Sequence, residues 1–191
     1  RKGVSAIKEL FDRHGSDKAN YHNYHELYGC ILHDRANVRS VLEIGLGTNN
    51  TDIACNMGSG AKPGASLRAF RDYFPKASVY GADIDHSILF EEERIRTFHV
   101  DQTDPESFEK LAGSLPGEID LIIDDGLHAP NANLLTFLFG VKKVSAGGWV
   151  VIEDVTSPVI WQTVAALLPE NLKPYFLHAE NGMIFAVQRL S

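Results

Sequence analysis

A short β-branched strand runs directly into a glycine turn at residues 38–47, which read VRSVLEIGLG. An apolar run of this length, bounded by a turn, is typical of a strand that is buried on both faces of a sheet. Gly45 and Gly47 suit the tight turn that follows, because glycine adopts positive φ angles and leaves room for a ligand beside the backbone. Glycines in such a turn can also be required by the backbone conformation alone, so the turn by itself does not establish a ligand site.

Strand and helix patterns alternate from residue 38 to the C-terminus, which indicates a parallel sheet with helices on both faces. After the first strand, we predict strands at residues 78–85, 96–101, 119–125, 148–154, 175–178 and 183–187. The last two flank Asn181-Gly182, a strong hairpin signal, so the sheet should end in an antiparallel pair. The prediction is an α/β fold with a doubly wound, mostly parallel seven-stranded sheet.

Helical patterns fill the gaps between these strands. Leu67, Phe70 and Phe74 have helical spacing, and Pro105 follows Asp104, a favourable N-cap. Residues 134–144 continue the helical pattern. We divide the chain into an N-terminal helical arm or lid, residues 1–37, and one domain, residues 38–191.

Several conspicuous residues are expected to have structural positions rather than a role in a site. We expect Trp149 and Trp161 in the core, and the run Glu91-Glu92-Glu93 on a solvated helix face. The aromatic side chains of the arm either form a lid or pack the arm onto the domain: His22, Tyr24, His25 and Tyr28.

Composition restricts the partners. The net charge is −7, and the basic residues are scattered, whereas nucleic-acid binding needs clustered Lys and Arg. No apolar run approaches the roughly 20 residues of a membrane helix, and no leader sequence is visible. Cys30 and Cys55 have no metal-type spacing, so we expect reduced thiols. We expect a cytoplasmic protein with a small-molecule substrate, and association into a homo-oligomer stays open.

Acidic residues close every predicted parallel strand: Glu43, Asp83, Asp85, Asp101, Asp124, Asp125, Glu153 and Asp154. Carboxylates crowded together repel one another unless they bind cations or accept hydrogen bonds from a ligand. Because the carboxyl ends of parallel strands meet at one edge of the sheet, we expect a binding crevice there. Asp83 closes the second strand, where an acid can accept hydrogen bonds from both ribose hydroxyls.

The turn lacks the third glycine of a dinucleotide-binding motif, since Asn50 stands in its place. Residues 48–64 instead form a long insertion rich in Asn, Gly and Ser, and no helix begins directly behind the turn. A pyrophosphate needs that helix N-terminus, so a cofactor without phosphates fits better.

A metal site is predicted at the ends of the fourth and fifth strands. Asp125, Glu153 and Asp154 would face one another there, and three carboxylates suit a hard divalent cation such as magnesium, calcium or manganese. Alternatively, Glu153 caps the next loop and Asp154 is merely solvated. His128 lies three residues after Asp125, and a histidine can act as a general base near neutral pH.

The sequences EIGLG at 43–47, YGAD at 80–83, Val100-Asp101 and Asp124, in this order, resemble the cofactor motifs of class I S-adenosylmethionine-dependent methyltransferases. The resemblance implies a Rossmann-like methyltransferase fold. It also implies that Glu43, Gly45 and Gly47 hold the methionine part, that Asp83 binds the ribose and that Asp101 reaches the adenine amino group. Asp124 belongs to the same cofactor-binding set.

The sequences IDDGLH at 123–128 and GGWVVIED at 147–154 resemble the metal-dependent sugar O-methyltransferases of macrolide antibiotic tailoring, as does GSDK at 15–18. This resemblance implies that Asp125, Glu153 and Asp154 bind Mg²⁺ or another hard divalent cation and that His128 is catalytic. We predict an S-adenosylmethionine-dependent O-methyltransferase that acts on a hydroxyl of a sugar or a sugar-bearing natural product. The alternatives are an NAD-dependent sugar-modifying oxidoreductase and a non-catalytic domain that binds an adenosyl ligand.

Overall fold

The structure, a computed structural model, describes residues 2–32 and 34–190. Its sheet has the strand order β3-β4-β2-β1-β5-β6-β8-β7. The strands are β1 (Ser40–Ile44), β2 (Ser78–Asp83), β3 (Glu91–Glu92), β4 (Ile95–His99), β5 (Ile119–Asp124), β6 (Val144–Ile152), β7 (Leu172–Ala179) and β8 (Gly182–Arg189). Neighbouring strands from β4 to β6 pair in parallel, whereas β8 is antiparallel to both β6 and β7.

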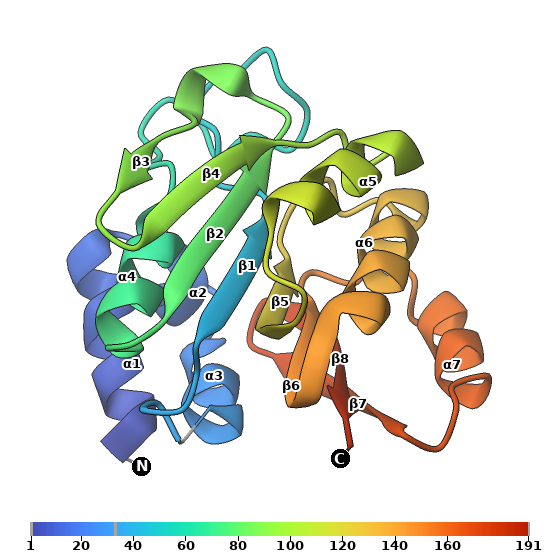
Figure 1. Cartoon of the computed structure of the whole chain (residues 1–191). Helices are drawn as coiled ribbons and strands as arrows, with labels where there is room; N and C mark the ends of the chain where they lie inside the picture. The colour runs from blue at the N-terminus through green and yellow to red at the C-terminus, as the bar shows by residue number, and fades with distance from the viewer. Residues whose placement is uncertain (1, 33, 191) are drawn as a thin grey trace.

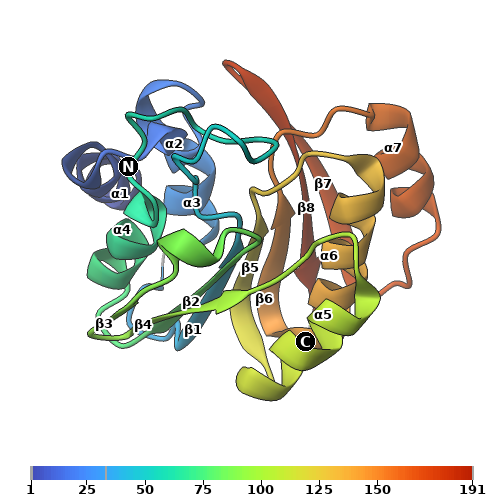
Figure 2. The ribbon, with the colours of Figure 1, turned by 90° about the horizontal axis from the view of Figure 1, so that it is seen from above.

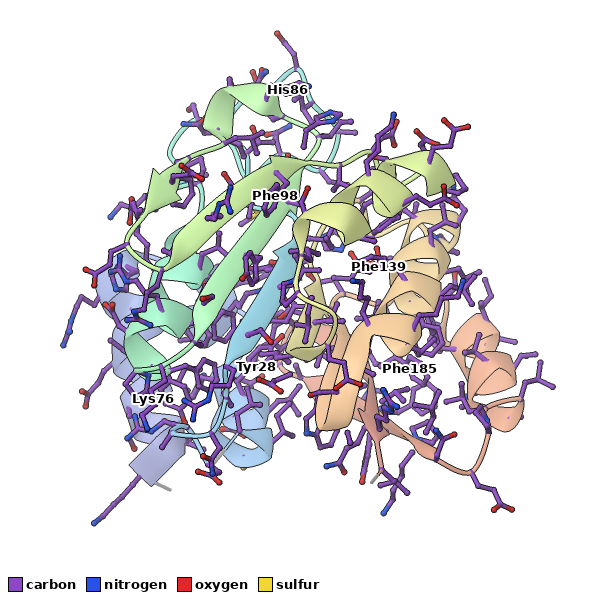
Figure 3. The ribbon with its side chains drawn as sticks, in the orientation of Figure 1. Tyr28, Lys76, His86, Phe98, Phe139 and Phe185 are labelled. Carbon is purple, nitrogen blue, oxygen red and sulfur yellow. The ribbon has the colours of Figure 1, made fainter. Side chains whose placement is uncertain are left out.

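Helices cover both faces of this sheet (Figures 1 and 2). One face carries α1 (Lys2–His14), α2 (Asp17–Asn20), α3 (His25–Ile31) and α4 (Ala65–Tyr73). The other face carries α5 (Pro105–Ser114), α6 (Pro130–Lys143) and α7 (Pro158–Ala166), and a short 3₁₀ helix, η1 (His86–Ile88), follows β2. Each face has its own apolar core; Figure 3 labels Tyr28 in the first and Phe139 and Phe185 in the second.

The predicted doubly wound α/β arrangement and the C-terminal hairpin are confirmed, but the sheet has eight strands rather than seven. The additional strand is β3, which pairs antiparallel with β4. The prediction that Glu91 and Glu92 lie on a helix is therefore wrong, since they form a strand. Arg94, at φ 59°, turns the chain back so that the two residues pair with β4, and exposed glutamates suit an edge strand because charge discourages further pairing.

The N-terminal arm shares a core with the rest of the chain. Ile7 and Phe11 of α1 are fully buried, and the Phe11 ring meets the Phe70 ring edge to face with centroids 5.4 Å apart. Tyr28 of α3 packs on the same Phe70 ring, with centroids 5.3 Å apart. These aromatic contacts fix α1 and α3 against α4, so the short helix α2 between them has a defined position.

Other features agree with the sequence. Trp149 and Trp161 are buried as expected, and Cys30 and Cys55 are both free. The N-cap predicted at Asp104 is present, since its side chain accepts a hydrogen bond from the backbone N–H of Glu106. In the part of the chain that the structure describes, no helix is long and apolar enough to span a membrane.

Candidate active site

A cavity of about 450 Å³ lies beyond the carboxyl ends of the central strands. Its walls include the glycine turn after β1, residues 125–128 after β5, and α2 of the arm. Parts of the insertion at residues 48–64 complete the wall; this insertion contains no helix or strand and lies across the end of the sheet, beside α2 (Figures 1 and 2). The insertion predicted from the sequence is thus a loop that borders the cavity.

The glycine turn packs directly against the loop after β5. Gly45 and Gly47 have φ angles of 92° and 72°, which side chains rarely adopt. A Cβ atom at Gly45 would overlap the carbonyl oxygen of Asp125. The absence of a side chain therefore allows β1 and the β5 loop to approach one another at the cavity.

Asp83 and Asp101 both line the cavity. Asp83 accepts backbone hydrogen bonds from Leu46 (2.7 Å) and Asp85 (2.9 Å), which tie the glycine turn to β2. Burial raises the pKa of Asp83, against the opposing effect of these donors. Asp101 accepts hydrogen bonds from the hydroxyl (2.7 Å) and the backbone N–H (2.8 Å) of Thr103, which lower its pKa. Carboxylate oxygens accept more than one hydrogen bond, so both acids can still accept from a ligand.

Asp124 lies beneath the cavity and does not line it. Its fully buried carboxylate accepts hydrogen bonds from the Gln102 amide (2.9 Å), the Asn133 amide (3.0 Å) and the Gly126 backbone (3.2 Å). Burial raises the pKa of Asp124, and the three donors oppose that rise. The direct cofactor contact expected for Asp124 does not fit this position, because its oxygens are turned to protein donors that hold the loop after β5.

Asp125, His128 and Asp154 converge on the cavity. His128 Nε2 lies 4.0 Å from Asp125 Oδ1 and 3.7 Å from Asp154 Oδ2. Each of the three residues offers one possible metal-ligand atom, and these three atoms lie within 4.8 Å of one another. His128 and Asp154 have φ angles of 53° and 50°. Non-glycine residues in this region carry strain of order 1–3 kcal/mol, and such residues cluster at functional sites. The two carboxylates are ligands that suit Mg²⁺ or Mn²⁺, and the imidazole lies beside them.

Glu153 is not in this group. It is 1% exposed, does not line the cavity, and binds the Lys18 ammonium and the Tyr28 hydroxyl. Burial raises its pKa well above the usual value, and Lys18 opposes the rise. The expected convergence of Asp125, Glu153 and Asp154 on one cation does not fit this arrangement, because a buried ammonium from the arm already neutralises Glu153.

Lys18 is the centre of this buried ion cluster. Its Nζ lies 2.7 Å from Asp125 Oδ2 and 3.2 Å from Glu43 Oε1, in addition to its bond with Glu153. Burial alone would lower the pKa of Lys18, but the three carboxylates raise it well above its usual value. Glu43 also accepts from the Ser66 hydroxyl and lies below the cavity rather than on its wall. The methionine contact expected for Glu43 does not fit this position, since its partners are protein groups.

The arm supplies two contacts at the site that sequence reasoning did not assign, those of Lys18 and Tyr24. The Tyr24 hydroxyl donates to Asp154 Oδ1, and the His22 ring stacks on Tyr24 with centroids 4.7 Å apart. His22 lines the cavity, whereas Tyr28 is in the core, so the arm both borders the cavity and packs on the domain. The sequence indicated this region through the GSDK segment at 15–18 with the following His22 and Tyr24, but it gave no role to the lysine.

No protein-family model matches the chain. The chain is 35% identical over 157 residues to the 8-demethyl-8-alpha-L-rhamnosyl tetracenomycin-C 2'-O-methyltransferase of Streptomyces olivaceus. The match covers 81% of this chain and 39% of that protein. The chain is also 41% identical over 93 residues to the mycinamicin VI 2''-O-methyltransferase of Micromonospora griseorubida, and this match covers 48% of the chain and 23% of that protein.

Among solved structures, the MycE methyltransferase from the mycinamycin biosynthetic pathway, in complex with Mg, SAH and mycinamycin VI, matches with a TM-score of 0.78 at 26% identity. The match covers 96% of this chain and 53% of that chain. A ribosomal RNA methyltransferase from Plasmodium falciparum shares the fold, with a TM-score of 0.64 at 16% identity over 91% of this chain and 96% of that chain. The chain spans about half of MycE and less of the two curated relatives.

Proposed function

The chain belongs to the class I S-adenosylmethionine-dependent methyltransferases and is related to the sugar O-methyltransferases of antibiotic pathways, and on that premise we propose that it methylates a hydroxyl of a sugar or a glycosylated natural product. One observation carries the proposal: Asp125, His128 and Asp154 converge on the same cavity that the glycine turn after β1 borders. Cofactor and acceptor would therefore meet in one space.

S-adenosylmethionine is proposed to lie along Gly45 and Gly47, since both glycines line the cavity. Asp83 would accept hydrogen bonds from the ribose hydroxyls, and Asp101 would reach the adenine amino group. Glu43 and Asp124 lie beneath this site without a direct contact to the cofactor, because neither acid lines the cavity; their partners are Lys18 and the loop after β5.

A hard divalent cation such as Mg²⁺ is proposed between Asp125 and Asp154, and Glu153 takes part only through Lys18. One or two carboxylates suffice, because Mg²⁺ usually keeps several of its waters. When bound, the cation supplies positive charge that favours the ionised form of a nearby acceptor hydroxyl. His128 would remove the hydroxyl proton, and the oxygen would bond to the methyl carbon as the bond from that carbon to sulfur breaks, which leaves S-adenosylhomocysteine. The cavity walls would hold the two reactants together. Such positioning contributes on the order of 7–11 kcal/mol at best.

Transfer of a radiolabelled methyl group from S-adenosylmethionine tests the proposal. Acceptors would be rhamnosyl and other deoxysugar conjugates, with the matching aglycones as controls. Methylation of the conjugates, and none of the aglycones, is expected. Oxidation of a sugar with NAD, followed by the absorbance of NADH, would instead favour the oxidoreductase, which the relatives do not support. Binding of S-adenosylhomocysteine without any transfer would favour the non-catalytic alternative.

The domain division, the location and the oligomeric state of the protein are also proposals. The division into an arm or lid, residues 1–37, and a cofactor-binding domain, residues 38–191, is supported by the position of α2 at the cavity. The cytoplasmic location stays a prediction. Association into a homo-oligomer stays open, and size-exclusion chromatography with light scattering would measure it.

A further inference from the structure

Asp125 and Asp154, the two carboxylates nearest to His128 in the cavity, each direct their two oxygens to different partners. Asp125 directs Oδ2 to Lys18 Nζ at 2.7 Å and Oδ1 to His128 Nε2 at 4.0 Å. Asp154 accepts the Tyr24 hydroxyl on Oδ1 and has Oδ2 3.7 Å from His128 Nε2. In each acid, one oxygen is held by the N-terminal arm, and the other faces the histidine.

The two holding groups have fixed positions. Lys18 is 1% exposed, and its ammonium donates hydrogen bonds to Asp125 and Glu153 and forms an ion pair with Glu43. Tyr24 is also 1% exposed, and its ring lies between the stacked His22 ring and Gly182, where a Cβ atom would overlap the tyrosine hydroxyl. Both side chains are therefore buried, and each contacts its acid directly.

We propose that Lys18 and Tyr24 are positioning residues that hold one oxygen of Asp125 and of Asp154, so that the other two oxygens face His128 and take a divalent cation. This inference rests on the proposed function, since it assigns the orientation of the same cation site. Groups that hydrogen-bond to metal ligands fix ligand orientation, and their loss typically weakens metal binding by about 10–100-fold.

A competing possibility is that Lys18 occupies the place of the cation and has to leave when a metal binds. The burial of Lys18 argues against it, because its departure would break three ion pairs and move the ammonium out of a site in which the residue is 1% exposed. The two possibilities predict opposite signs when the ammonium is removed. Positioning predicts weaker metal binding, and competition predicts tighter binding.

The first test compares two conservative variants from the same arm, Tyr24→Phe and Tyr28→Phe. Mn²⁺ binding would be measured from the paramagnetic resonance signal of the free ion, with S-adenosylhomocysteine present and no acceptor. We expect Tyr24→Phe to weaken Mn²⁺ binding by about 10–100-fold. Tyr28→Phe should leave it unchanged, since that hydroxyl binds Glu153 outside the cavity. Both variants should keep their affinity for S-adenosylhomocysteine.

The second test removes the ammonium. Lys18→Met alone leaves buried carboxylates unpaired and can prevent folding, so it is combined with Glu153→Gln, which removes one of these charges and keeps an acceptor for Tyr28. Weaker Mn²⁺ binding is expected, whereas tighter binding would establish competition and overturn the inference.

The outcomes separate this inference from the proposed function. Unchanged Mn²⁺ affinity in Tyr24→Phe, with wild-type binding intact, overturns positioning by Tyr24 alone. Equal weakening in Tyr24→Phe and Tyr28→Phe also overturns it, because the effect would then be general to the arm. A wild-type protein that binds no Mn²⁺ would contradict the metal part of the proposed function and this inference with it.

Discussion

Replacing Asp124 separates a structural role from a cofactor contact. Its carboxylate accepts three hydrogen bonds, from Gln102, Asn133 and the backbone of Gly126, and is fully buried. In Asp124→Ala all three donors lose this partner, and an unsatisfied buried donor costs about 1–3 kcal/mol. Because water can enter the vacated space and satisfy some of them, we expect a loss of about 3 kcal/mol in the free energy of unfolding.

Asp124→Asn is the milder member of the series. Asparagine keeps one acceptor oxygen, and the neighbouring amide of Asn133 can turn to accept the new N–H. We expect a loss of about 1 kcal/mol, the usual net value of one hydrogen bond. For a domain of this size, each kcal/mol lowers the midpoint of thermal unfolding by roughly 2–4 °C.

The assay pairs thermal unfolding with calorimetric titration of S-adenosylhomocysteine. Folded Asp124→Asn should bind the ligand as the wild type does, because Asp124 does not line the cavity. Asp101→Ala is the matched control, since Asp101 lines the cavity and its carboxylate accepts two exposed hydrogen bonds from Thr103: affinity should fall, and stability should fall by less than in Asp124→Ala. Wild-type stability in Asp124→Asn together with lost affinity would refute this reasoning and return Asp124 to the cofactor site.

Three further predictions follow from the cavity. Asp83→Ala should weaken the binding of S-adenosylmethionine by about 1.5–3 kcal/mol in calorimetry, as a charged acceptor is lost; unchanged affinity removes Asp83 from the ribose site. A chelator should abolish methyl transfer, Mg²⁺ or Mn²⁺ should restore it, and cofactor binding should survive; full activity in excess chelator contradicts the metal site. His128→Ala should lower kcat by about 10²–10⁴-fold and spare cofactor and Mn²⁺ affinity; loss of Mn²⁺ with activity would make His128 a ligand instead of the base.

The strands and their ends were predictable because each follows from local sequence. The run at residues 38–47 contains both the apolar strand and the glycines, and Asn181-Gly182 specifies its own hairpin. The short strand β3 was not predictable in this way, because it exists only through pairing with β4, and three successive glutamates carry no strand pattern.

The candidate site was predictable only to the level of the loop. The sequence indicated that acids gather at the strand ends. It did not show which of two adjacent acids lines the cavity and which lies beneath it. Asp124 and Asp125 are neighbours in sequence and point to different partners, as do Glu153 and Asp154. Lys18 was not predictable because two of its three carboxylate partners, Asp125 and Glu153, lie more than a hundred residues away along the chain.

A crystal structure of the protein with S-adenosylhomocysteine and Mn²⁺ tests the account most directly, because the anomalous signal of manganese marks the cation independently of the protein atoms. The account predicts one strong anomalous peak bounded by Asp125 and Asp154 on the His128 side of the cavity, with the adenosyl group between the glycine turn and Asp101. A peak among Glu43, Glu153 and a displaced Lys18, or a ligand outside this cavity, would contradict it.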